Sequence, residues 1–172
     1  MAVLRLLGLD PGLQRTGWGV IECDAGRLRF IACGAVASDA GDPLAVRLDV
    51  LYRGLAEIIE AHTPHLAAVE ETVVNRNADS SLKLGQARGV VLLAAAHHGL
   101  AVHEYAAKRV KRSVVGTGSA DKRQVGMMVR TLLPLCGEPG PDAADALAVA
   151  ICHAHHHESA GRLQAAMLGL RP

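Results

Sequence analysis

Residues 4–20 read LRLLGLDPGLQRTGWGV, an apolar run that ends on a single acid, Asp10, and breaks at once into Pro11 and Gly12. The unbroken apolar residues predict a buried strand over Val3–Asp10, and the Pro-Gly pair predicts a turn directly behind it. A carboxylate at the end of a buried strand costs free energy unless it is paired or holds a metal. Asp10 alone can also cap the turn, so its role depends on which other acids fold beside it.

The rest of the chain alternates between helix and strand patterns after an antiparallel start. A hairpin turn is expected at 24–26, and later helices are expected to be capped by Asn77 or Asp79 and by Ser119. The expected elements are strands over 3–10, 16–22, 28–38, 66–70 and 100–105, and helices over 43–62, 79–98, 119–133 and 142–157. This order predicts an α/β fold: a five-stranded mixed sheet, antiparallel in its first three strands, with helices on both faces.

Length and composition predict one globular domain. The 172 residues are 50% hydrophobic, which argues against disorder, and no apolar stretch is long enough to span a membrane. The N-terminus lacks the features of a signal peptide. The four cysteines are widely spaced without a CxxC pair, which favours reduced thiols in a cytoplasmic protein over a disulfide framework. We expect a folded domain over 1–157 and a loosely ordered tail over 158–172.

Three further acids occur where elements begin or end. Glu70 closes the apolar strand LAAVE, and Asp142 and Asp145 lie three apart in the first turn of the helix PDAADALAVA. The helix dipole accounts for one such aspartate and accounts less well for two. Clusters of carboxylate oxygens suit hard cations, above all Mg²⁺ or Mn²⁺. A pair of such ions can activate water and stabilise the leaving oxygen in phosphodiester cleavage.

A local basic stretch accompanies these acids in a chain of net charge +1. Between Tyr105 and Arg123 the sequence holds one acid, Asp121, and six basic residues: Lys108, Arg109, Lys111, Arg112, Lys122 and Arg123. Such a stretch favours a patch for a polyanion, where it would bind the phosphates on either side of a cleaved bond. A solvated helix face with long cationic side chains gives the same pattern, so charge alone leaves both readings open.

Four stretches carry a resemblance to a known family. They are LGLDPGLQRTGWGV, AAVEETVVNRNADSSLKLGQARGVVL, YAAKRVKRSVVGTGSADKRQVGMMVRTLL and PDAADALAVAICHAH, and together they span nearly the whole chain to about His157. The sequence resembles the RuvC family of bacterial Holliday-junction resolvases, within the RNase H-like (retroviral integrase) superfamily. The first stretch is shared in part by actin-like kinases, whereas the NADSSLKLGQARG and DAADALA stretches, in this order, are specific.

The resemblance implies a homodimer that nicks two opposed strands of a four-way DNA junction with Mg²⁺, two ions in each site, beside the RuvA–RuvB branch-migration complex. It implies that Asp10, Glu70, Asp142 and Asp145 hold the metal and are catalytic. It also implies that Lys111 and Lys122 act at DNA phosphates near the site, and Arg76 matches another basic position of the family. The expected DNA-contacting residues are Arg76, Lys83, Lys108, Lys111, Arg112, Lys122 and Arg123.

Two positions near Glu70, Glu71 and Val73, bear on the expected site. Strand alternation allows only one of Glu70 and Glu71 to face the site, and the resemblance selects Glu70. The family usually carries an aromatic residue three positions later, where this chain has Val73. Since aromatic residues make up only 2% of the chain, recognition is expected to depend on phosphates and DNA shape rather than on base stacking.

Other features have competing interpretations. CHAHHH at 152–157 offers zinc-type ligands, but an exposed helix end is the favoured reading because no second cluster completes a tetrahedral site. The small residues Ala87, Val91, Ala94 and Ala95 form either core or the expected dimer contact. An actin-like ATP-binding module would need a second lobe for which the chain is too short. A non-catalytic junction-binding domain is disfavoured by the four acids.

Overall fold

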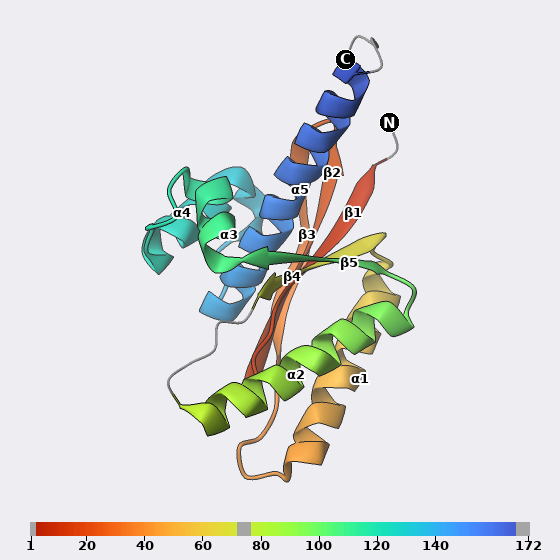
Figure 1. Ribbon diagram of the computed structural model, residues 1–172, viewed down its shortest axis with the longest axis vertical. Helices are drawn as coiled ribbons and strands as arrows, with labels where there is room; N and C mark the ends of the chain where they lie inside the picture. The colour runs from red at the N-terminus through yellow and green to blue at the C-terminus, as the bar shows by residue number, and fades with distance from the viewer. Residues whose placement is uncertain (1–2, 72–76, 168–172) are drawn as a thin grey trace.

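A five-stranded mixed sheet forms the centre of the molecule (Figure 1). The computed structural model describes residues 3–71 and 77–167, with side chains described as far as residue 160. The strands are β1 (Leu4–Asp10), β2 (Arg15–Asp24), β3 (Arg27–Ala37), β4 (Leu66–Glu71) and β5 (Ala101–Ala106). Their order is β3-β2-β1-β4-β5, antiparallel among the first three and parallel where β4 pairs with β1 and β5. The predicted sheet is confirmed.

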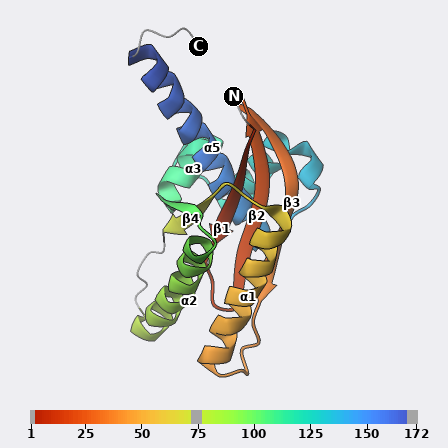
Figure 2. The same cartoon turned by 90° about the vertical axis from the view of Figure 1, so that its right-hand side faces the viewer.

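Helices cover both faces of this sheet, as the turned view shows (Figure 2). One face carries α1 (Leu44–His62) and α2 (Ala78–His97), and the other carries α3 (Ala107–Val115), α4 (Lys122–Leu132) and α5 (Pro141–Met167), with a short 3₁₀ turn, η1 (Pro134–Cys136), after α4. Leu7 and Leu9 of β1 pack with α1 and α2, whereas Leu6 packs on the α5 side. Among the described residues, no helix is long and apolar enough to cross a bilayer.

The basic stretch folds differently from the prediction. It contains α3, which the sequence pattern missed because only Val110 and Val114 form the buried side of this short helix. Helix α4 is capped by Asp121 rather than by Ser119, since Asp121 and Gln124 form a reciprocal capping box. The cation-rich stretch therefore lies on two short helices beside α5.

Helix α5 is longer than predicted and lies directly on the sheet (Figure 1). It continues to Met167, past the predicted end at His157 and through part of the segment expected to be a loose tail. Three glycines lie beneath it: a β-carbon on Gly8, Gly17 or Gly19 would lie 2.1, 2.0 or 2.6 Å from the nearest α5 atom. The lack of side chains at these positions lets α5 approach the strands closely.

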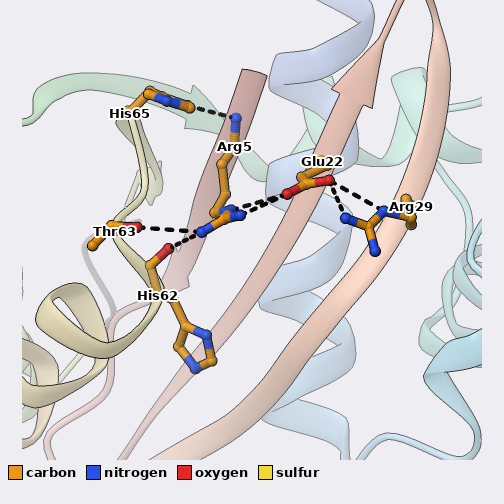
Figure 3. Close-up of polar contacts among 6 residues, drawn as sticks. All are labelled: Arg5, Glu22, Arg29, His62, Thr63 and His65. Carbon is orange, nitrogen blue, oxygen red and sulfur yellow. Dashed lines mark hydrogen bonds and ion pairs between the residues drawn. The ribbon is translucent and has the colours of Figure 1, made fainter. Parts of the chain in front are cut away.

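At the start of β1, a charged network joins the strands to the end of α1 (Figure 3). Glu22 of β2 is buried and accepts hydrogen bonds from Arg5, at 3.1 and 2.8 Å, and from Arg29. Arg5 also donates to the carbonyl oxygen of His62 at 2.7 Å and to the hydroxyl of Thr63 at 3.2 Å. The hydrogen bonds from the two arginines lower the pKa of Glu22. One buried carboxylate thus joins three strands, β1, β2 and β3, and, through Arg5, the end of α1.

Replacing this carboxylate should destabilise the fold. Glu22→Gln is expected to lower the free energy of unfolding by about 2 kcal/mol, because it leaves two guanidinium groups without their shared counter-charge; the exposure of Arg29 keeps the loss below that of a fully buried pair. Thermal unfolding at pH 7 should show a melting temperature lower by about 4–8 °C. Asp49→Asn, which breaks the exposed Asp49–Arg53 pair, should change it little. Equal losses in both variants would contradict a special role for Glu22.

Candidate active site

Two acids end neighbouring parallel strands on the same face of the sheet. Asp10 is the last residue of β1, and Glu70 lies near the end of β4, which pairs in parallel with β1. Ala68 packs in the core on the α5 side. Alternation along β4 therefore directs Glu70 to that side and the exposed Glu71 to the opposite side. The geometry places Glu70, rather than Glu71, beside Asp10.

The turn behind Asp10 is closed without its carboxylate. The hydroxyl of buried Thr16 donates to the carbonyl oxygen of Gly12 at 2.8 Å, and the Gly12 N–H donates back to Thr16 Oγ1 at 3.3 Å. In the part of the chain that the structure describes, no hydrogen bond joins the Asp10 side chain to this turn. The Asp10 carboxylate therefore does not cap the Pro-Gly turn.

The first turn of α5 brings the other two acids to the same edge. Asp142 forms an ion pair with Arg15 of β2, at 3.1 Å between Nε and Oδ2. Asp145 accepts a hydrogen bond at 2.8 Å from the ammonium group of Lys122, at the start of α4. The sequence analysis missed Arg15, and its position just behind the DPG turn was the one available signal. All four predicted acids are brought together, and two of them already have cationic partners.

Burial, and then mutual repulsion, raise the pKa values of two of the acids. Burial, reinforced by the negative charge of Asp145, raises the pKa of Asp10 to about 6 against the opposing charge of Lys122. Burial, followed by the charges of Asp10 and Asp145, raises the pKa of Glu70 to about 7. The hydrogen bond to Asp145 raises the pKa of Lys122, which therefore stays protonated. The cluster is a half-buried concentration of negative charge that its neighbouring cations only partly balance.

This donor set fits a hard divalent cation. All four groups offer carboxylate oxygens, the ligands that Mg²⁺ and Mn²⁺ prefer. The raised pKa values of Asp10 and Glu70 are those expected where added positive charge would be favourable. Over residues 3–71 and 77–167, no three His, Cys, Asp or Glu side chains are gathered closely enough to hold an ion as they stand. The ion pairs made by Arg15 and Lys122 hold Asp142 and Asp145 in their present positions.

The buried charge should make stability depend on pH. Asp10 binds its proton more tightly in the folded chain than the ordinary pKa of 3.8 allows, so charging it costs stability as the pH rises from about 4 to above 6. Asp10→Asn removes this cost. In metal-free buffer, the variant should match the natural chain near pH 4 and exceed it by up to about 3 kcal/mol at pH 8. Thermal unfolding across this range tests it; a stability difference independent of pH would contradict it.

Three predicted DNA-contacting residues lie around the acids. Lys111 of α3 contributes positive charge that lowers the pKa of Glu70, and Lys122 holds Asp145. Arg123 lines a hollow of about 500 Å³ between α4 and the start of α5. A strand whose phosphate reached the acids would meet these cations on the α3 and α4 side.

The remaining predicted basic residues lie elsewhere. Lys108 and Arg112 line a second hollow, between α3 and α5. Lys83 lies on α2, where an acid of its own helix pairs with it at 2.8 Å, so the structure does not bring it into either hollow. Arg76, like Val73, lies outside the described residues.

The histidine-rich segment is not an exposed helix end, so that prediction is wrong. Cys152 and His153 are buried, because α5 continues past them over the sheet. The ring nitrogen Nδ1 of His153 lies 2.7 Å from the hydroxyl of Tyr105 in β5. Within the described residues this segment forms no group able to hold a metal ion.

The alanine-rich side of α2 is core. Its four small residues pack with α1 and the sheet: Ala87, Val91, Ala94 and Ala95. This face is not available to a second chain, so the predicted dimer contact through these residues is wrong. The outer side of α2 instead exposes Leu82 and Leu93, at 63% and 57%.

Comparison with known proteins agrees with this geometry. Residues 6–153 match the family described as crossover junction endodeoxyribonuclease RuvC. Proteins of that name from Azorhizobium caulinodans and Paramagnetospirillum magneticum are 55% and 58% identical, over 96% and 95% of this chain and 98% and 99% of theirs. The structure of T. thermophilus RuvC in complex with Holliday junction substrate matches with a TM-score of 0.85 and 33% identity, over 91% of this chain and 96% of that one. This chain belongs to the RuvC family of crossover junction endodeoxyribonucleases.

Proposed function

We propose that this protein resolves four-way DNA junctions by metal-dependent hydrolysis of phosphodiester bonds in two opposed strands. The observation that carries the proposal is the meeting of Asp10, Glu70, Asp142 and Asp145 at one edge of the sheet, with Lys111 and Lys122 beside them. Relatives that share most of its length are named crossover junction endodeoxyribonucleases. The activity serves recombination and DNA repair in the bacterial cytoplasm.

The four carboxylates are proposed to hold Mg²⁺, two ions in each site, with Mn²⁺ able to replace it. When bound, the ions supply an activated water and stabilise the charge that develops on the cleaved phosphate. The ion pairs of Arg15 and Lys122 indicate a role for these two cations. Arg15 and Lys122 pair with Asp142 and Asp145. Where a bound metal would take over the charge of these two acids, Lys122 and Arg15 would be available to a DNA phosphate. Lys111, beside Glu70, orients the strand from the α3 side.

Symmetric cleavage of a junction requires two sites in one assembly. We propose a homodimer, with the outer side of α2 as its contact, because Leu82 and Leu93 are exposed there while the inner side of α2 is already buried in the chain. The RuvA–RuvB branch-migration complex is the proposed partner that delivers junctions, as the family resemblance implies.

One experiment tests the proposal directly. The protein is incubated with a synthetic four-way junction and Mg²⁺, beside a linear duplex of the same sequence and an EDTA control. The expected products are paired nicks at symmetry-related positions in two opposed strands of the junction, with the duplex intact. Junction binding without nicking in either Mg²⁺ or Mn²⁺ would instead support a non-catalytic junction-binding domain.

A further inference from the structure

A basic hollow lies between α3 and α5, apart from the four acids. Its volume is about 620 Å³. Three cationic side chains of α3 line one side, Lys108, Arg109 and Arg112, and polar side chains of α5 line the other: His155, His156 and Ser159. No acid lines it. The hollow offers charge and hydrogen-bond donors suited to an oxyanion.

The three cations lack counter-charges of their own. In the described part of the chain, neither Lys108, Arg109 nor Arg112 forms an ion pair, although Arg15 and Lys122 at the acidic site each form one. The nearest acid along α5, Glu158, points to the β2–β3 turn, where a β-carbon on Gly26 would lie 2.5 Å from a carboxylate oxygen. The positive charge of the hollow is therefore available to a ligand.

Arg109 is held in place before any ligand arrives. Its guanidinium carbon lies 5.5 Å from the centre of the Tyr105 ring, and its Nε donates a hydrogen bond to Nε2 of His156 at 3.1 Å. The His156 ring also stacks on Tyr105, with ring centres 5.5 Å apart. These contacts fix the plane of the guanidinium and leave its terminal nitrogens to donate, the arrangement that suits a phosphate with paired acceptor oxygens.

The cations of α3 form a continuous track away from the acids. At about 100° per residue, Lys111, Lys108, Arg112 and Arg109 span about 160° of the helix surface, in that order. Lys111 lies at the Glu70 end of this arc and Arg109 at the hollow. Along α5, His156 lies about 16 Å from Asp145, at 1.5 Å per residue. For a duplex running beside α5, that distance corresponds to about five base pairs.

We propose that the hollow between α3 and α5 holds a backbone phosphate of a junction arm, about five nucleotides from the cleaved bond, with Arg109 as its main ligand. The inference rests on the proposed function and adds a second contact, outside the acidic site, that positions the arm. It assigns Tyr105 and His156 the role of orienting Arg109.

The test pairs a protein variant with single neutral phosphates in the DNA. Arg109→Gln should raise the dissociation constant for a four-way junction about tenfold and reduce the salt dependence of binding by about one ion. In the DNA, single phosphates three to eight nucleotides from the cut are replaced in turn by methylphosphonate. At one of these positions the replacement should weaken junction binding by the natural protein by a similar factor. The same replacement should not weaken junction binding by Arg109→Gln any further, because the two changes remove the same contact.

The controls separate this inference from the proposed function. Arg53→Gln removes the same charge from α1, on the opposite face of the sheet, and should leave binding within twofold. The melting temperature and circular dichroism spectrum of Arg109→Gln, compared with those of the natural protein, show whether the variant is folded. If no methylphosphonate position distinguishes the two proteins, the hollow holds no DNA phosphate even though cleavage stands. If the natural protein fails to cleave junctions, it is the proposed function that falls.

Discussion

Asp10→Asn and Glu70→Gln are each expected to slow junction cleavage by about 10³-fold or more while leaving junction binding in place. Each change removes one of the negative charges proposed to hold Mg²⁺ and keeps the shape of the side chain. Metal ions stabilise the charge that develops in the transition state of such reactions by several kcal/mol. Each 1.36 kcal/mol corresponds to a factor of ten in rate. The cations that meet the phosphates, Lys111 and Lys122, are untouched. Single-turnover cleavage and a binding titration in Ca²⁺ measure the two effects separately.

Glu71→Gln is the matched control for both variants. It makes the same chemical change one residue from Glu70, on the side of β4 that faces away from α5, where the Glu71 side chain is exposed. Cleavage by this variant should stay within about twofold of the natural rate. Near-natural cleavage by Asp10→Asn or Glu70→Gln would show that these carboxylates do not hold the metal. A large loss in Glu71→Gln would show that β4 presents the other face to the DNA.

The acids were predictable because each one lies near the end of a strand or the start of a helix. An apolar run that stops on Asp10 or Glu70 predicts the strand and, within one residue, where it ends. Parallel pairing of β1 and β4 then places both acids at one edge. The partners of the acids were not predictable in this way. Arg15 and Lys122 lie far in sequence from the α5 acids that they pair with, and only the fold brings them together. No local sequence pattern encodes such pairing.

Two wrong predictions have a common physical cause, since a pattern along the chain does not reveal what covers it. The small residues of α2 gave a helical stripe that fits a second chain as well as it fits α1 of the same chain, and the structure shows α1. Because the helical pattern weakens after His157, it predicts an exposed helix end that includes His153. The helix in fact continues to Met167, and His153 meets Tyr105 beneath it.

The close approach of α5 to the sheet is what brings Asp142 and Asp145 to Asp10, and Gly17 controls it. In the β1–β2 register Gly17 lies directly opposite Asp10. A β-carbon on Gly17 would lie 2.0 Å from the carbonyl oxygen of Asp142, which is backbone and cannot rotate away. The start of α5 would have to move outward by an ångström or more. Gly17 thus sets the distance between Asp10 on β1 and the acids at the start of α5.

Gly17→Ala is therefore expected to lower cleavage by about 10²-fold, since a displacement of about 1 Å in a reacting group costs that much. The free energy of unfolding should also fall by about 1–3 kcal/mol because of the forced contact. Gly41→Ala is the control: the same substitution in the loop before α1, where the nearest atom would lie 3.4 Å from the β-carbon, should change neither quantity measurably. Cleavage should be measured well below the melting temperature of Gly17→Ala, so that lost activity is not lost folding. If the folded variant cleaves at the natural rate, α5 tolerates the shift and the spacing of the acids is not limiting.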